Sequence, residues 1–151
     1  MDIKVTVQGV LTDPKTETQI VLLKADSNSE VIPIWVGAAE GSAIKFALEG
    51  VLPPRPMTHD LLKSTLDHLS IRVQKVIVTE IKNNTYYATV YLENGGSVFT
   101  VDARPSDAIA LAVRSHAAIY ATEEVFKKRS NENLDDWLNQ LNPQDFGQSD
   151  A

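Results

Sequence analysis

The chain has 151 residues, 43% of them hydrophobic, which is typical of one globular domain able to bury most of its apolar surface. It contains no cysteine, which excludes disulfide bridges, thiolate zinc sites and a cysteine nucleophile. The net charge of −6 is concentrated in residues 130–151, which carry five acidic and no basic side chains, so the remainder is nearly neutral. Binding of nucleic acid through a broad basic surface is therefore excluded, and any such binding needs a local basic patch or a metal ion.

The N-terminus enters an alternating apolar segment directly, without the basic stretch and long apolar run of a signal peptide. No apolar run elsewhere reaches the length that spans a membrane. We therefore expect a cytoplasmic protein with no membrane partner.

Hydrophobic periodicity and turn residues divide the chain into short strands and helices. Alternating or continuous apolar runs predict strands at residues 3–11, 19–25, 30–36, 71–81, 85–93 and 97–102. Helical spacing predicts helices at residues 40–48, 105–115 and 123–128, and an amphipathic helix carrying Leu134, Trp137, Leu138 and Leu141. Pro105 suits a first helical position, and Asn83-Asn84 and Asn94-Gly95-Gly96 predict turns between strands.

The two halves of the chain repeat the same order of elements. Residues 36–48 align with residues 101–113, and residues 5–10 align with residues 71–76, which indicates an internal duplication. The predicted fold class is α+β, built from duplicated βββα units. Each half is too small to bury its own sheet, so we expect antiparallel sheets forming one merged core.

A further helix is expected to link the halves. Thr58 has the side chain of an N-cap, and the apolar face of this helix consists of Leu61, Leu62, Leu66 and Leu69. The predicted domain covers residues 1–130, and residues 131–151 form an acidic amphipathic C-terminal helix and tail.

The densest polar cluster lies where a strand is expected to turn into a helix. Asp102, Arg104, Ser106 and Asp107 fall within six positions there. The carboxylates of Asp102 and Asp107, if they converge, could bind Mg²⁺ or Mn²⁺, and the guanidinium of Arg104 could bind a phosphate. The alternative is a structural corner, in which Asp107 caps the helix and Arg104 pairs with Asp102.

Two other segments carry polar side chains suited to binding or proton transfer. Arg55 lies between prolines as a phosphate-binding candidate, and His59 follows as a general base, although the segment could equally be a capped helix start. Glu40 is aligned by the duplication with Pro105 at a helix start, where it could join the acidic cluster or cap its own helix. Trp35 is expected to be a core residue rather than a surface for base stacking.

Several short sequence motifs of this chain together resemble those of the bifunctional nuclease domain family. The matching motifs lie at residues 34–44, 54–61, 86–88 and 102–112, and the resemblance spans about residues 3–125. It implies hydrolysis of DNA or RNA phosphodiester bonds, since the family name reflects both activities. It assigns no catalytic role to any residue.

Combining the residues with the resemblance gives a hypothesis for the site. A divalent metal bound by Asp102 and Asp107, with Glu40, activates water; Arg55, Arg104 and Ser106 bind the substrate, and His59 moves a proton. The alternative is a non-catalytic binding or regulatory module. Nucleic acid and a second copy of the chain, in a homodimer formed by sheet edges or the apolar C-terminal face, are the expected partners.

Overall fold

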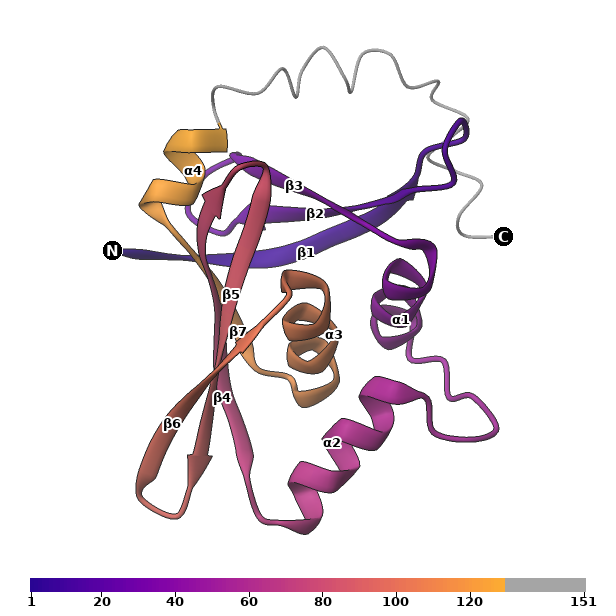
Figure 1. Cartoon of the computed structure of the whole chain (residues 1–151), viewed down its shortest axis with the longest axis vertical. Coiled ribbons are helices and arrows are strands. Elements are labelled where there is room, and N and C mark those ends of the chain that lie inside the picture. The colour runs from indigo at the N-terminus through magenta and orange to yellow at the C-terminus, as the bar shows by residue number, and fades with distance from the viewer. Residues whose placement is uncertain (130–151) are drawn as a thin grey trace.

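The computed structural model describes residues 1–129, which form seven strands and four helices (Figure 1). In chain order the elements are β1 (Asp2–Thr12), β2 (Gln19–Ala25), β3 (Val31–Val36), α1 (Ala38–Glu49), α2 (Thr58–His68), β4 (Arg72–Lys82), β5 (Thr85–Asn94), β6 (Ser97–Ala103), α3 (Pro105–Ser115), β7 (Ala118–Thr122) and α4 (Glu123–Arg129). The predicted elements within these residues are confirmed, with small shifts at their ends. The predicted C-terminal amphipathic helix lies outside the described residues.

All seven strands belong to one sheet, in the order β3-β2-β1-β7-β4-β5-β6. β1, β2 and β3 form one antiparallel meander, and β4, β5 and β6 form another. The α+β class is therefore confirmed, and each half builds three strands followed by a helix. The predicted duplication stays a prediction, because the order of elements alone does not establish common descent.

The prediction of antiparallel sheets is wrong at one position, because β7 joins the two meanders into a mixed sheet. β7 pairs antiparallel with β1 and parallel with β4. The sequence does not predict this strand, because its five residues are too few to show a clear period and two of them are alanine. Its insertion between β1 and β4 makes the merged core possible.

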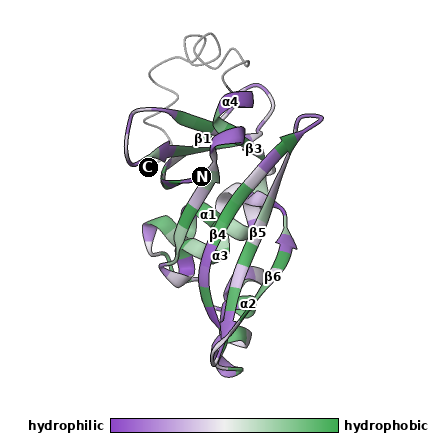
Figure 2. Ribbon diagram, turned by 90° about the vertical axis from the view of Figure 1, so that its left-hand side faces the viewer, coloured by the Kyte–Doolittle hydropathy of each residue, from purple (hydrophilic) through white to green (hydrophobic). Residues whose placement is uncertain are grey.

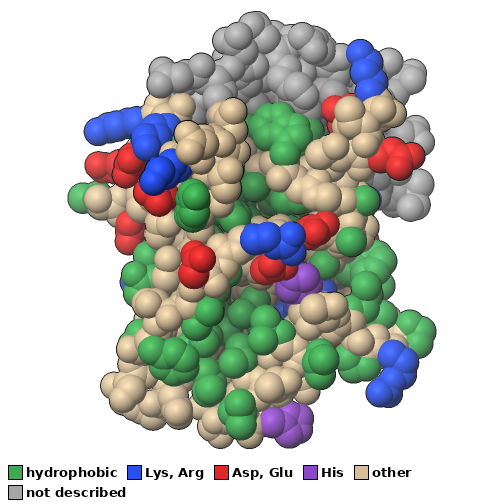
Figure 3. Space-filling model, viewed as in Figure 1, with side chains coloured by type: hydrophobic (Ala, Val, Ile, Leu, Met, Phe, Trp, Pro, Cys, Tyr) green, Lys and Arg blue, Asp and Glu red, His purple; other side chains and the backbone are tan. Residues whose placement is uncertain are grey.

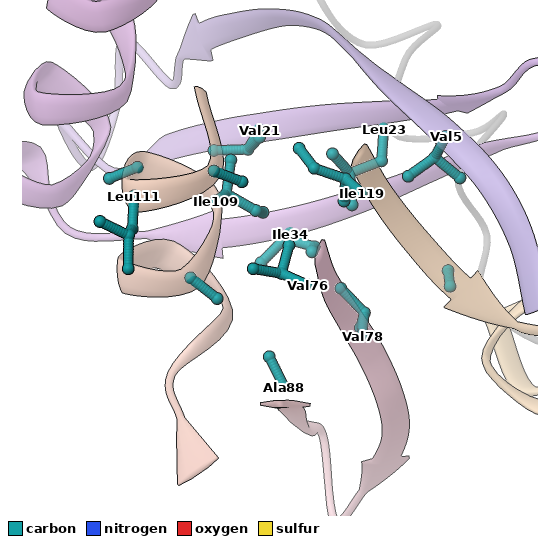
Figure 4. Packing of buried hydrophobic residues seen from close by; sticks show 14 of the residues in the cluster. Val5, Val21, Leu23, Ile34, Val76, Val78, Ala88, Ile109, Leu111 and Ile119 are labelled. Atoms are coloured by element: carbon teal, nitrogen blue, oxygen red, sulfur yellow. The ribbon is translucent and has the colours of Figure 1, made fainter. Parts of the chain in front are cut away.

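The core is centred on α3, which lies in the hollow of the curved sheet beside α1 and α2 (Figure 1). Five consecutive residues of this helix, from Ala108 to Ala112, are buried, so the helix is enclosed on almost every side. Its alanines keep the helix thin enough for neighbours to approach closely, while Ile109 lies near strand residues of both halves, such as Val21 and Val76 (Figure 4). One hydrophobic cluster thus joins the two halves.

The two β-turns follow the sequence prediction. Asn83 and Asn84 both adopt positive φ, of 53° and 61°, in the turn between β4 and β5. Gly95 has a φ of 61° in the turn between β5 and β6. Two-residue hairpins need this left-handed backbone, which asparagine and glycine tolerate best.

The linking helix α2 differs from its prediction in two ways. Thr58 is its first helical residue rather than its N-cap, which is Met57. Only Leu66 of the predicted apolar face is buried, whereas Leu61, Leu62 and Leu69 are exposed. The helical period was correct, but α2 contacts the core along one narrow line, so three leucines stay at the surface.

The outer face of the second meander lies on the far side from the helices. Figure 2 shows β4, β5 and β6 in front of α1, α2 and α3, with hydrophobic and hydrophilic residues alternating along the strands. The helix-facing positions of β5 are Ala88, Val90 and Leu92, which are buried. Among the described residues, no helix combines the length and apolarity needed to span a lipid bilayer.

Candidate functional site

The first turns of three helices meet at one place in the molecule. Glu40 lies in the first turn of α1, His59 in that of α2 and Asp107 in that of α3, while Arg104 is the N-cap of α3. Near the centre of the face in Figure 3, basic, acidic and histidine side chains come together. Each helix start adds partial positive charge from unpaired N–H groups, so the place favours carboxylates and other anions.

His59 and Asp107 form a hydrogen-bonded pair. Nε2 of His59 lies 2.8 Å from Oδ1 of Asp107, and the His59 side chain is only 12% exposed. Partial burial raises the pKa of Asp107, but hydrogen bonds from Arg104 and His59 outweigh it, so the pKa lies below its usual value. The ionised carboxylate can only accept, so Nε2 donates and Nδ1 of neutral His59 keeps its lone pair.

Arg104 connects the starts of α3 and α1. Its Nε donates to Oδ2 of Asp107 at 2.8 Å, its Nη2 to Oδ1 of Asp107 at 3.1 Å and its Nη1 to Oε2 of Glu40 at 3.2 Å. The hydrogen bond to Asp107, with a smaller contribution from Glu40, raises the pKa of Arg104. The guanidinium has five N–H groups and its side chain is 64% exposed, so two donors that make no hydrogen bond within residues 1–129 can bind an incoming anion.

The site also contains a pair of residues that holds α2 against α3. Asp60 accepts from the backbone N–H of Met57 at 2.9 Å, and from Nε of Arg114 at 2.8 Å. The hydrogen bond from Arg114, then that from Met57, lowers the pKa of Asp60. Arg114 lies seven residues after Asp107 on the same face of α3. The adjacent residues His59 and Asp60 of α2 therefore contact α3 at two points, which lie about 10 Å apart along α3.

Neither Asp60 nor Arg114 was among the site residues predicted from the sequence. The seven-residue spacing from Asp107 was the signal, because it predicts two side chains on one helix face. The spacing indicates a site only together with the structure, in which Asp107 contacts His59 and Arg114 contacts Asp60.

Asp102 is not brought to this cluster. It lies opposite Thr89 in the pairing of β5 with β6, whereas Ala103 lies opposite Ala88, which is buried beneath α3. Cross-strand partners share a face and neighbours alternate, so Asp102 is on the face away from α3. Arg104 accordingly pairs with Asp107 and Glu40, not with Asp102.

The carboxylates expected to bind a metal therefore do not converge within one chain. Arg104 occupies the space between Glu40 and Asp107, where a cation would have to bind. Residues 1–129 contain no cluster of three or more His, Cys, Asp or Glu side chains able to hold a metal ion. Binding of Mg²⁺ or Mn²⁺ stays a prediction from the sequence.

The remaining predicted residues have different positions. Arg55 is exposed in the loop before α2, and within residues 1–129 it makes no hydrogen bond or ion pair with the cluster. Ser106 is buried in the first turn of α3. Trp35 was expected in the core, but it lies near the end of edge strand β3 and is 43% exposed.

Glu40 has a more specific position than the sequence alignment gave it. It is the third residue of α1, as Asp107 is of α3, whereas the alignment matched it with Pro105 at the first. Gly37, the N-cap of α1, lies so close that a Cβ there would overlap the Glu40 carboxylate. The absence of a side chain at Gly37 thus lets Glu40 reach Arg104.

Comparison with known proteins agrees with the resemblance found in the sequence. The model of the bifunctional nuclease domain matches residues 21–133. The Mycobacterium tuberculosis protein named uncharacterized protein Rv1829 is 33% identical over 122 residues, which cover 81% of this chain and 73% of that protein. The chain therefore belongs to the bifunctional nuclease domain family.

Plant proteins in the same comparison carry the family's name as their own. Bifunctional nuclease 1 of Arabidopsis thaliana is 31% identical over 109 residues, covering 70% of this chain and 34% of the plant protein. Bifunctional nuclease 1 of Oryza sativa subsp. japonica is 28% identical over 118 residues, covering 76% and 36%. This chain thus matches about a third of each plant protein.

Proposed function

We propose that this protein is a nuclease that hydrolyses phosphodiester bonds of DNA or RNA, with His59 as the general base. The observation that carries the proposal is the short contact between His59 and Asp107 at the junction of three helix starts. Family membership and the names of the plant relatives support the choice of a nucleic-acid substrate.

The proposed reaction assigns a role to each member of the cluster. Asp107 holds His59 in the tautomer whose Nδ1 is basic, and no hydrogen bond from another residue of the described chain engages that nitrogen. Nδ1 takes a proton from a water molecule as the water oxygen attacks phosphorus. The bond from phosphorus to the leaving sugar oxygen breaks, and that oxygen takes a proton from solvent.

Arg104 supplies the positive charge in this proposal. Its two remaining N–H groups bind the phosphate oxygens, and the helix starts add their partial charges. Glu40 and Asp107 fix the guanidinium in place, which limits the entropy lost when the phosphate binds. No step of this reaction uses a metal ion.

The proposal is tested by cleavage of labelled single-stranded DNA, duplex DNA and RNA with highly purified protein, with and without EDTA. His59→Ala is expected to lower the rate by about 100- to 10,000-fold. His68→Ala is the matched control, because His68 lies on the same helix and is exposed, and within residues 1–129 its side chain bonds only to the Ser64 carbonyl oxygen. Equal activity in wild type and folded His59→Ala would contradict the proposal.

The second candidate function is a non-catalytic binding module. It is supported by the engagement of Arg104 with two carboxylates, which also describes an ion-paired structural corner. In that case purified protein has no nuclease activity under any metal condition. A nucleic acid that binds only the native state would still raise its melting temperature.

We also propose that two copies of the chain associate through β6 and the neighbouring leucines of α2. β6 is an edge strand, and Val98, Phe99 and Val101 are 49%, 42% and 45% exposed. Figure 3 shows hydrophobic side chains gathered on the lower half of the face, over β6 and α2. An apolar edge without lysine or proline is open to pairing with another strand.

A further inference from the structure

We propose that the cavity beside Arg104 binds a nucleobase, so that the substrate is a single strand with an unpaired base. This proposal rests on the proposed nuclease function and adds a subsite to it. The cavity, which we call the base cavity, has a volume of about 320 Å³. Its lining includes Trp35, Glu40, Asn84, Tyr86, Arg104 and Ser106.

The base cavity is continuous with the catalytic cluster. Arg104 and Glu40, joined by a 3.2 Å hydrogen bond, belong to both. A phosphate held by the free N–H groups of Arg104 therefore places its attached nucleoside next to the cavity. The volume falls at the lower end of the range for ligand pockets, which suits one nucleoside rather than a longer segment.

Two aromatic side chains line the cavity from opposite halves of the chain. Trp35 comes from β3 and is 43% exposed, and Tyr86 comes from the start of β5 and is partly buried. Aromatic rings bind bases by stacking, which every base can do because each has a π-face. Such a platform predicts affinity for bases with little preference among them.

The polar groups of the cavity suit an uncharged ring with hydrogen-bonding edges. Ser106 is only 6% exposed and lines the cavity, so its hydroxyl can donate to or accept from a base edge. The amide of Asn84, at the left-handed turn between β4 and β5, adds a donor and an acceptor.

The charges of the lining argue against a second phosphate in the same place. Arg104 is the only Lys or Arg among the lining residues, and it already faces two carboxylates. A base reaches such a cavity only when it is unstacked and unpaired, as in single strands and loops. The site therefore favours single-stranded DNA and RNA over duplexes.

The test measures binding of fluorescent phosphorothioate oligothymidylate, which resists hydrolysis, to the full-length chain and its variants. Trp35→Ala is expected to weaken binding by about 5- to 100-fold, the loss of one stacked base. Trp35→Phe is expected to keep most of the affinity. Tyr87→Ala is the matched control, because Tyr87 is also partly exposed but does not line the cavity.

A second probe separates stacking from binding of the backbone. A strand of the same length with abasic sugars is expected to bind weakly, and equally well to wild type and Trp35→Ala. Unchanged binding of oligothymidylate by folded Trp35→Ala, an equal loss on the abasic strand, or equal affinity of wild type for duplex would overturn the base cavity.

Failure of the base cavity is distinguishable from failure of the nuclease proposal. If Trp35→Ala binds oligothymidylate like wild type while cleavage still depends on His59, only the base cavity is wrong. If wild type neither binds oligothymidylate nor cleaves any nucleic acid, both proposals are wrong.

Discussion

The helices α1 and α3 each follow a three-stranded meander, and each has a carboxylate at its third residue, Glu40 and Asp107. The start of α1 has Gly37 as its N-cap and no basic side chain of its own. The start of α3 has Arg104 as its N-cap and receives His59 from α2. The two helix starts thus have a similar scaffold, but the histidine and the arginine of the proposed reaction lie at the start of α3.

This comparison separates the roles of two similar carboxylates. Among side chains of residues 1–129, Asp107 accepts from both His59 and Arg104, whereas Glu40 accepts from Arg104 alone. In the proposed reaction Asp107 therefore controls the tautomer of the general base His59, whereas Glu40 only supports the position of the Arg104 guanidinium.

The largest expected effect is that of Asp107→Asn on cleavage. The amide can donate to Nε2 and stabilise the wrong tautomer of His59, so we expect the rate to fall about 100- to 10,000-fold. Combination with His59→Ala is expected to cause no further loss, because the two residues act as a unit. Asp67→Asn, on the exposed surface of α2, is the control.

The different roles of Asp107 and Glu40 would be contradicted if Glu40→Gln lowered cleavage as much as Asp107→Asn. They would also be contradicted if the losses in the Asp107→Asn/His59→Ala double variant multiplied, since independent residues behave in that way.

The next largest effect is expected for Asp60→Ala on stability. Arg114 is 9% exposed, and removal of Asp60 leaves its charge buried without the partner at 2.8 Å. We expect the free energy of unfolding in urea to fall by about 3 kcal/mol. Asp67→Ala, which breaks the exposed pair with Lys63, is expected to cost less than about 1 kcal/mol.

The same residue predicts the direction of the pH dependence. The pKa of Asp60 is lowered in the folded protein, so its stabilising effect is complete above the unfolded pKa near 4. It is lost as the pH falls through the folded value. Asp60→Asn is therefore expected to lose less stability than wild type between about pH 5 and pH 2, in urea titrations. An unchanged slope would contradict this role.

The fold was largely predictable because strong periodicity marks its elements, while the site was predictable only in part. The polar residues Arg104 and Asp107 were predicted as site residues from their sequence motif, and both lie in the cluster. His59, in the first turn of α2, was also predicted. Asp102 lies apart from the cluster because strand alternation places it on the other face from Val101 and Ala103, which closeness in sequence alone does not reveal.

Other features depend on tertiary contacts that no local pattern carries. β7 becomes a strand because β1 and β4 both leave an edge beside it. The helical spacing of Leu61, Leu62 and Leu69 in α2 is typical of core residues, but their side chains are exposed in the structure. Trp35 likewise was assigned to the core by its chemistry alone.

The two edge strands of the sheet, β3 and β6, also differ, and the mutational effect expected there is of intermediate size. β3 has buried Ile32, Pro33 and Ile34, whereas β6 has six exposed residues among its seven. If β6 forms the proposed dimer contact, Phe99→Lys is expected to weaken association by about 2 kcal/mol, or about 30-fold, in sedimentation. Val31→Lys on the β3 edge is the control. A monomeric wild type would contradict the proposed contact.

The smallest effect is expected for Glu40→Gln. The amide oxygen still accepts from Arg104, and the lost charge pair is largely solvated on the arginine side. We expect stability to change by less than about 1 kcal/mol and cleavage by less than about tenfold. Kinetics and urea unfolding of this variant show whether the start of α1 only supports the site.

The most direct test of proton transfer by His59 is chemical rescue of the His59→Gly variant. The glycine leaves space beside Asp107, and imidazole added to the buffer can occupy it and accept the proton. We predict that cleavage by folded His59→Gly rises with imidazole concentration and saturates, while wild type and His68→Gly do not respond. Folded His59→Gly that cleaves like wild type, or that imidazole fails to restore, would contradict a general base at this position.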